Sequence, residues 1–145
     1  MSTVFDVVED KGYGVHAIIP DATVHQAVQR MCVHRIGALL VATEERTLGI
    51  VSERDVLTRV ILEGREPART NVEQVMTVDV ACVRPGTSIK EAMAIMTQRR
   101  VRHLPVVADG AVIAMVSIGD LVQWVSREQA FELRQLTEYV QGGYC

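Results

Sequence analysis

The sequence predicts an α/β (α+β) fold built from two β-α-β-β-α units that pack with pseudo-twofold symmetry. When the chain is shifted against itself by 65 residues, residues 15–62 align with 80–127 without a gap, and the apolar positions stay in phase. Within each unit, short β-branched runs alternate with segments of helical periodicity. A unit of about 50 residues has too little interior to be stable alone. Two such units are therefore expected to bury their apolar faces against each other.

Each unit opens with a short strand and an amphipathic helix. The runs "VHAII" and "VACV" are rich in β-branched residues and end at Pro20 and Pro85, whose rings remove a backbone donor and close the strand. In "VHQAVQRMCVHR" and "IKEAMAIMTQRR" the apolar residues recur at helical spacing, which predicts one helix in each unit. Thr23 and Ser88 directly precede these runs and are the expected N-caps.

A hairpin and a second helix complete each unit. The paired runs are "GALLVA" with "TLGIVS" and "HLPVVA" with "AVIAMVS", and Asp109-Gly110 in the second pair is a strong hairpin turn signal. The helices that follow are expected to end at Gly64 and Gly142. The chain then divides into an N-terminal helical lead-in at 1–14, a first unit at 15–64, a linker at 65–79 with one helical turn at 72–76, a second unit at 80–128 and a C-terminal helix extension at 129–145.

Composition excludes several classes of protein. Hydrophobic residues make up 48% of the chain and the net charge is −3, which gives no general attraction to nucleic acid or to acidic membranes. No secretory signal and no run of 18 apolar residues is present, so we expect a cytoplasmic protein. Cys32, Cys82 and Cys145 lack metal or disulfide spacing and are expected to be reduced, with Cys32 and Cys82 buried.

The same short motif, Ser-x-x-Asp, recurs where each hairpin runs into its second helix. Ser52 and Asp55 form the first copy, and Ser117 and Asp120 form the second. One interpretation is a helix cap, in which the serine accepts from first-turn N–H groups and the aspartate reaches back. The other is a ligand site, because strand ends beside helix N-termini commonly hold ligands and a carboxylate there suits ribose hydroxyls. Both roles are compatible with one residue.

With these motifs the chain resembles a tandem pair of CBS (cystathionine β-synthase) domains, a Bateman module. The strands "IGALLV" and "VRHLPVV", the turns "GIVSERD" and "AMVSIGD", and "EQVMT" before the second unit carry the resemblance, which covers residues 15–126. It implies a binding module for an adenosyl ligand such as AMP, ATP, NAD or S-adenosylmethionine, held in one or both clefts between the halves. No catalytic cofactor and no metal site is implied.

The resemblance also implies which residues bind the nucleotide. The motif aspartate would hold the ribose hydroxyls and the motif serine would lie beside the ribose-phosphate, while the first and second strands of each unit would flank the base and phosphates. The residues at these positions are Ser52, Arg54, Asp55, Ile36, Ala38, Ala17 and Ile18 for the first unit, and Ser117, Asp120, Val101, His103, Cys82 and Val83 for the second.

The two sites are expected to differ in affinity. A basic His103 stands where the first unit has Ala38, and Arg54 stands where the second unit has Gly119. Arg54 would add charge to the first site and His103 would face phosphate in the second. Leu40 replaces the proline of the second unit, and Ala114 replaces the glycine of the first, and either change is expected to narrow one pocket.

The leading functional hypothesis is a stand-alone regulatory sensor that binds an adenine nucleotide and has no catalysis of its own. The alternatives are a ligand-free dimerisation module, in which each Ser-x-x-Asp is only a cap, and a small nucleotide hydrolase that uses Asp55 or Asp120. The hydrolase lacks a metal cluster or a general-base partner beside those carboxylates. Apolar residues along the last helix, including Trp124, Phe131 and Val140, indicate a homodimer through the helices of the two units and the C-terminal helix. An unidentified regulated protein is a further expected partner.

Overall fold

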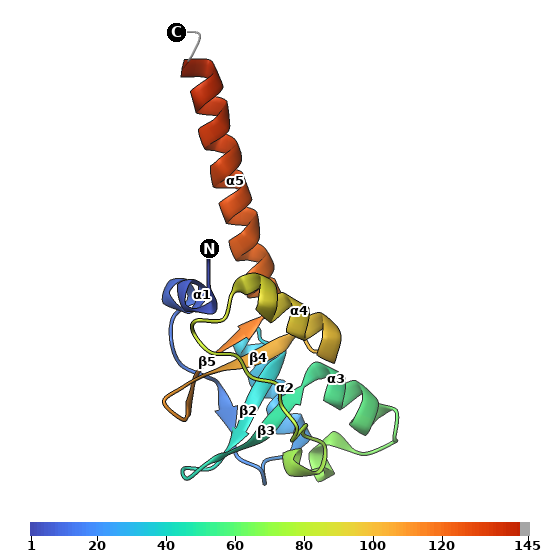
Figure 1. Cartoon of the computed structure of the whole chain (residues 1–145). Helices are drawn as coiled ribbons and strands as arrows, with labels where there is room; N and C mark the ends of the chain where they lie inside the picture. The colour runs from blue at the N-terminus through green and yellow to red at the C-terminus, as the bar shows by residue number, and fades with distance from the viewer. Residues whose placement is uncertain (143–145) are drawn as a thin grey trace.

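The computed structural model describes residues 1–142, with side chains to Glu138. The expectations for Val140 and Cys145 therefore concern side chains outside the described residues. The elements are α1 (Val4–Lys11), β1 (Ala17–Ile18), α2 (Val24–His34), β2 (Ala38–Ala42), β3 (Thr47–Ser52), α3 (Glu53–Val56), the π-helical turn η1 (Leu57–Ile61), the 3₁₀ turns η2 (Pro67–Arg69) and η3 (Val72–Gln74), α4 (Ile89–Arg99), β4 (His103–Ala108), β5 (Ala111–Ser117) and α5 (Ile118–Gly142). Figure 1 shows two small sheets packed together, with α5 projecting away from them.

The sheets follow the repeat. In the first unit β1 pairs parallel to β2, which pairs antiparallel to β3, and in the second β4 pairs antiparallel to β5. Ala38 faces Ser52, and the equivalent pair is His103 and Ser117. Asp109 and Gly110 both have positive φ, as the predicted hairpin turn requires.

The predicted first strand of the second unit is wrong in its extent. Instead of a strand over "VACV", the structure has a single parallel bridge between Val83 and Val106. The N–H of Val83 donates to the carbonyl of Pro105 at 3.0 Å, and the N–H of Val107 donates to the carbonyl of Val83 at 2.8 Å. The proline carries no N–H of its own, so the ladder at β4 is limited on this side.

The helices begin where the caps predict. Thr23 accepts from the N–H of Gln26 at the start of α2, and Ser88 accepts from the N–H of Glu91 at the start of α4. The second helix of the first unit changes from α to π geometry at Leu57, where the N–H of Leu62 reaches back to the Leu57 carbonyl at 3.0 Å. It ends in a turn at Gly64, whose φ is positive.

Each unit is covered by the segment that precedes the other unit. The N–H of Val4 in α1 donates to Thr87 of the second unit at 2.8 Å, and the N–H of Val72 in η3 donates to Ala22 of the first at 2.8 Å. Thr87 and Ala22 are equivalent in the repeat. Farther along, Gly14 pairs with β5 at Ala114, while Thr77 pairs with β3. The chain therefore exchanges its two lead-in segments, which the sequence did not predict.

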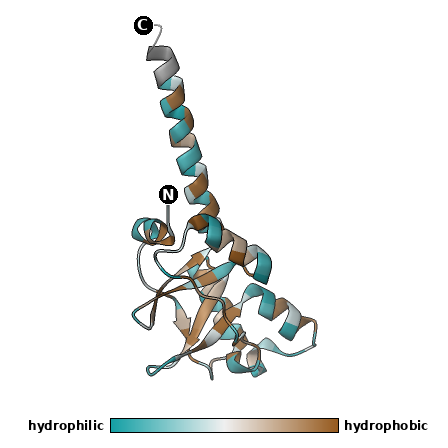
Figure 2. Cartoon of the chain, in the orientation of Figure 1, coloured by the Kyte–Doolittle hydropathy of each residue, from teal (hydrophilic) through white to brown (hydrophobic). Residues whose placement is uncertain are grey.

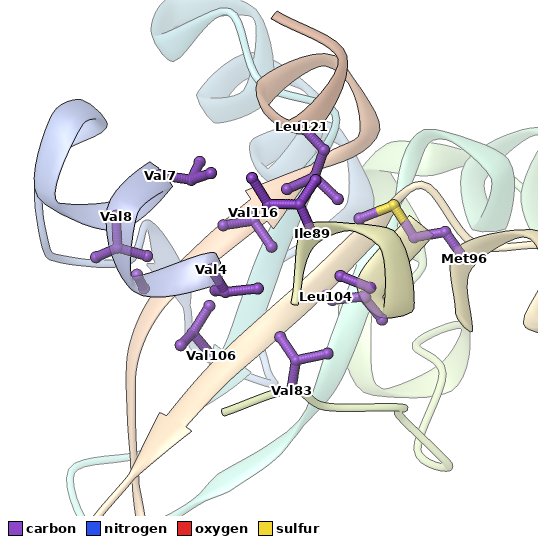
Figure 3. Packing of buried hydrophobic residues seen from close by; sticks show 12 residues of the cluster. Val4, Val7, Val8, Val83, Ile89, Met96, Leu104, Val106, Val116 and Leu121 are labelled. Carbon is purple, nitrogen blue, oxygen red and sulfur yellow. The ribbon is translucent and has the colours of Figure 1, made fainter. Parts of the chain in front are cut away.

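The buried hydrophobic residues form three clusters, and two of them include residues of the exchanged segments. The second unit's core includes α1, and Figure 3 shows Val4, Val7 and Val8 in one cluster with Leu104 and residues of β5 and α5. The first unit's core takes in Val72 and Val75 from the linker. A third cluster, made of Ala38, Leu40 and Ile50 with partly buried neighbours that include Met115, joins the two units. Figure 2 shows the same concentration of hydrophobic residues on the strands.

Gly49→Ala is expected to lower the free energy of unfolding by about 1–3 kcal/mol, because it overpacks a close backbone contact. A Cβ at Gly49 would lie 2.4 Å from the carbonyl oxygen of Thr77, which cannot move without breaking its bridge to β3. Gly86→Ala is the control, since a Cβ there meets nothing within 4 Å. Urea denaturation measures both, and equal stability of the two variants would contradict the expectation. In the second unit, Ala114 of β5 is the equivalent of Gly49. There the glycine is on the other chain segment, because Ala114 pairs with Gly14 of the N-terminal lead-in.

Candidate functional site

A cavity of 530 Å³ lies where the first Ser-x-x-Asp turn meets the second unit. We call it the Asp55 cavity. The first unit contributes the end of β3 and the start of the following helix, with Gly37 and Ile50. The linker and the start of the second unit contribute residues 77–81, and the turn from the end of α4 to the start of β4 contributes residues 99–103. The lining residues are Gly37, Ile50, Ser52, Glu53, Arg54, Asp55, Leu57, Thr77, Asp79, Val80, Ala81, Arg99, Arg100, Val101, Arg102 and His103. Both units and the segment between them therefore contribute to one site.

The Asp55 carboxylate is held as a cap and still has room to accept hydrogen bonds. Oδ2 accepts from the N–H of Ser52 at 2.9 Å and from its hydroxyl at 3.1 Å, while the Ser52 Oγ accepts from the N–H of Asp55. Oδ1 accepts from the hydroxyl of Thr77 at 3.0 Å, and Nε of Arg59 lies 3.9 Å from the same oxygen. Because each carboxylate oxygen has two acceptor sites, Oδ1 can accept a further hydrogen bond from a ligand. The predicted capping role of this motif is confirmed.

The second copy of the motif makes the same cap in a different setting. The N–H of Ser117 donates to Asp120 Oδ2 at 2.8 Å, and the N–H of Asp120 donates to the Ser117 hydroxyl at 3.1 Å. The same Oδ2 is 2.7 Å from the ammonium of Lys11, which also donates to the carbonyl of Met115 at 2.7 Å. Lys11 of α1 thus meets the oxygen of Asp120 that also accepts from the cap N–H, whereas Thr77 and Arg59 meet the other oxygen of Asp55.

The structure groups the basic residues differently from the sequence expectation. Arg54 and His103 were assigned to separate sites, but both line the Asp55 cavity, because the Ser52 turn faces the start of β4 across the boundary between units. The guanidinium of Arg54 donates to the carbonyl of Arg100 at 3.1 Å, which links the two sides of the cavity. Glu53 and Asp79 add negative charge to the same walls.

The other predicted site residues lie elsewhere. Ala38 is buried in the cluster between the units, and Ile36 packs against the first unit's core. Val83 is buried in the second unit's core, and Cys82 is exposed, as is Cys32, so the expectation that both thiols are buried is wrong. Ala17 and Ile18 line a separate, open groove of 640 Å³ along α2.

Comparison with known proteins identifies the family. The sequence model of the CBS domain matches residues 4–62 and 72–127. This chain is a CBS-domain protein. It is 41% identical over 152 residues to the mitochondrial CBS domain-containing protein CBSX3 of Arabidopsis thaliana, which covers 99% of this chain and 74% of that one. It is 30% identical over 131 residues to the CBS domain-containing protein YhcV of Bacillus subtilis, covering 90% of this chain and 91% of YhcV.

Solved structures agree with the CBS assignment. A CBS-domain protein from Burkholderia ambifaria, whose given name proposes a role in signal transduction, superposes with a TM-score of 0.85 at 40% identity. The match covers 88% of this chain and 96% of that one. The predicted tandem CBS fold is confirmed.

Sequence reasoning missed two polar residues that this CBS pair places at its aspartates. Thr77 is the last residue of "EQVMT", which lies before the second unit in the sequence, and nothing in the motif indicates a contact with Asp55 of the first unit. Lys11 is one of two lysines in the chain and precedes the region of the repeat. Both belong to the exchanged lead-in segments, so only the tertiary pairing reveals them.

Among the described residues, no helix is long and apolar enough to cross a membrane, and no group of three or more His, Cys, Asp or Glu could hold a metal ion.

The stability of this CBS protein is expected to fall as the pH drops through the range below about 6.5. Burial lowers the pKa of His103 from 6.5 by disfavouring the charged imidazole; Glu53 and Asp120 raise it to a smaller extent, and Lys11 and Arg102 lower it. The unfolded chain therefore binds more protons than the folded one between the lowered pKa and 6.5, so stability rises with pH across that window and is lost as pH falls.

His103→Gln tests this dependence, because glutamine keeps a polar side chain without titrating. Urea denaturation between about pH 5 and pH 8 is expected to show a shallower dependence in the variant than in the wild type. The His16 imidazole also has a lowered pKa, through burial and then His34, so part of the dependence should persist. Identical slopes in the two proteins would contradict the assignment to His103.

Proposed function

We propose that this CBS pair is a regulatory module that binds an adenosine-containing nucleotide in the Asp55 cavity, with AMP, ATP and NAD as the leading ligands and no catalysis of its own. The observation that carries the proposal is the Asp55 side chain, which is 9% exposed, faces a cavity and keeps acceptor capacity on Oδ1. A buried carboxylate with an unfilled acceptor position favours a ligand that brings hydroxyl donors.

The chemistry of the cavity wall suits the three parts of a nucleotide. Two vicinal ribose hydroxyls can donate to Asp55, as they do to the acidic residue of dinucleotide folds. Apolar side chains of Ile50, Val80 and Val101 offer a surface for a base. Arg54 and His103 supply donors for phosphate, and guanidinium groups match phosphate oxygens in geometry.

The size of the cavity is also consistent with a nucleotide. At 530 Å³ it falls in the range of about 300–1,000 Å³ that small-molecule sites usually occupy. The three acidic residues in its wall, Glu53, Asp55 and Asp79, are countered by four arginines. This balance favours a ligand with an anionic and a neutral part over a simple anion.

The regulatory role is supported by the names of relatives, which describe CBS-domain proteins and, for the Burkholderia ambifaria structure, a proposed role in signal transduction. Ligand binding between two units would change how they pack and so how a regulated protein recognises them. A cytoplasmic location stays a prediction of the sequence, and the Arabidopsis relative is named as mitochondrial.

We also propose that the chain forms a homodimer that uses α5. Phe131, Leu133 and Leu136 are each more than half exposed on this projecting helix. Leu133 and Leu136 are three residues apart and therefore lie on one side of the helix, and adjoining exposed apolar side chains of this kind mark interaction sites. Light scattering of the wild type is expected to give the mass of two chains, and Leu133→Glu with Leu136→Glu is expected to give one chain with an unchanged fold. A monomeric wild type would contradict the dimer without affecting the nucleotide proposal.

The nucleotide proposal is tested by a ligand screen. Purified protein is titrated by calorimetry with AMP, ADP, ATP, NAD, NADH and S-adenosylmethionine, and the solution is analysed afterwards for products. Saturable binding of at least one ligand without turnover is expected. Failure of all six to bind would leave the ligand-free dimerisation module as the better account, and product formation would favour the hydrolase.

A further inference from the structure

The segments that cross over the two Ser-x-x-Asp turns carry different groups to the two aspartates. Thr77 brings a neutral hydroxyl to Asp55 at 3.0 Å. On the other side, Lys11 brings an ammonium to Asp120 at 2.7 Å, and this ammonium is fixed a second time by the carbonyl of Met115. Both aspartates also have a cation nearby, but at different distances. Arg59 Nε lies 3.9 Å from Asp55 Oδ1, whereas the Lys11 ammonium is in direct contact with Asp120 Oδ2 at 2.7 Å. The charge of Asp120 is therefore compensated more closely than that of Asp55.

The ammonium is delivered by a helix that is firmly docked. Thr3 forms a bridge with Ser88 in front of α4, and Val4, Val7 and Val8 are fully or almost fully buried in the second unit's core. Near the C-terminal end of the helix, Asp10 pairs with Arg127 of α5 at 2.8 Å. Because α1 is held along its length, the backbone of Lys11 is already fixed, and pairing with Asp120 costs only the rotamer freedom of the lysine side chain.

The repeat also places a pair of histidines at positions equivalent to two that line the Asp55 cavity. Ala81 and Arg99 line the Asp55 cavity, and the repeat places His16 and His34 at the equivalent positions. These two imidazoles are stacked with their ring centres 4.0 Å apart. Burial, then His34, Arg30 and Lys11, lower the pKa of His16, so Lys11 lies close enough to affect this pair. Where the Asp55 cavity has Ala81 and Arg99, the equivalent positions in the first unit have two stacked imidazoles.

From these contacts we infer that the chain closes its own second cleft, with Lys11 of α1 occupying the Asp120 carboxylate in place of a ligand. The inference rests on the proposed function, because it assigns which of two related clefts takes a nucleotide. A ribose at Asp120 must displace the ammonium and approach past the His16–His34 pair. One nucleotide therefore binds per chain, at Asp55, and α1 is the element that keeps the second site empty.

The experiment counts bound nucleotides per chain. Equilibrium dialysis with AMP and with ATP is done on the wild type, on Lys11→Ala, on Lys11→Thr, which offers Asp120 a hydroxyl as Thr77 does Asp55, and on the double variant Lys11→Ala with Asp120→Asn. Lys90→Ala is the matched control, because it removes the other, exposed lysine and the same unit of charge. Thermal melts confirm that each variant is folded.

We expect one nucleotide per chain in the wild type and in Lys90→Ala, two in Lys11→Ala or Lys11→Thr, and one again in the double variant. Two nucleotides in the wild type, one in both Lys11 variants, or weaker binding after loss of Lys11 would overturn the inference and leave the proposed function standing. No binding to the wild type, with one Asp120-dependent nucleotide in Lys11→Ala, would instead overturn the proposed function and support the closed cleft. No binding to either protein overturns both.

Discussion

Asp55→Asn is expected to weaken nucleotide binding by about tenfold to more than a hundredfold. A hydrogen bond to a charged group contributes about 1.5–3 kcal/mol, and a factor of ten in affinity corresponds to about 1.4 kcal/mol. The amide keeps one oxygen for the N–H of Ser52, and its NH₂ group can donate to the Thr77 hydroxyl, so the helix cap survives. What the variant loses is the charge and the free acceptor on Oδ1. Calorimetric titration with the tightest ligand measures the loss.

Asp120→Asn is the matched control for this variant. It makes the same chemical change in the equivalent cap, where Lys11 already holds the carboxylate. Affinity within about twofold of the wild type is expected. If the two variants lost affinity equally, the binding site would not be the Asp55 cavity alone. If Asp55→Asn bound as tightly as the wild type, the carboxylate would have no part in recognition.

Leu104→Ala is expected to lower the free energy of unfolding by about 2–5 kcal/mol, because it leaves a cavity in the core of the second unit. Leu104 on β4 is fully buried and lies in the cluster that also contains α1. Leu39 on β2 is its equivalent in the repeat and is also fully buried, so Leu39→Ala is expected to cost a similar amount. Urea denaturation followed by circular dichroism measures both losses.

The control is Leu62→Ala, at a leucine that is 80% exposed, where a change within about 0.5 kcal/mol is expected. Because the lead-in segments are exchanged between the units, each core variant is also expected to unfold the whole chain in one transition. Two separate transitions, with only one of them shifted by Leu104→Ala, would show that the units fold independently and would contradict the shared architecture.

Local structure could be predicted from the sequence because local interactions decide it. The hairpin ends at Ala108 and Ala111 follow from the Asp109-Gly110 turn, and the helix starts follow from hydroxyl caps at Thr23 and Ser88. Because the sequence repeats, each strand and helix is predicted independently in both units. The tandem CBS fold, and with it the capping role of both motif aspartates, was therefore accessible from the residues alone.

The composition of the candidate site was less accessible, because it depends on contacts between segments far apart in the chain. Arg54 and His103 share one cavity only because the turn of one unit faces the strand of the other. The placement of Lys11 at Asp120 spans more than a hundred residues. The "VACV" run has strand-forming residues, but it lies beside Pro105, so propensity overstated the strand. A sequence repeat shows which residues of the two units are equivalent, but not which residues of one unit contact the other unit.

The most direct test of the account is a crystal structure of the protein with the nucleotide that binds best in the screen. The account predicts one ligand per chain in the Asp55 cavity, with its ribose hydroxyls within hydrogen-bond distance of Asp55 and its phosphate beside Arg54 or His103. Lys11 is expected to stay paired with Asp120 in that structure. A ligand bound at Asp120, or in the open groove beside His34, with the Asp55 cavity empty would contradict the account.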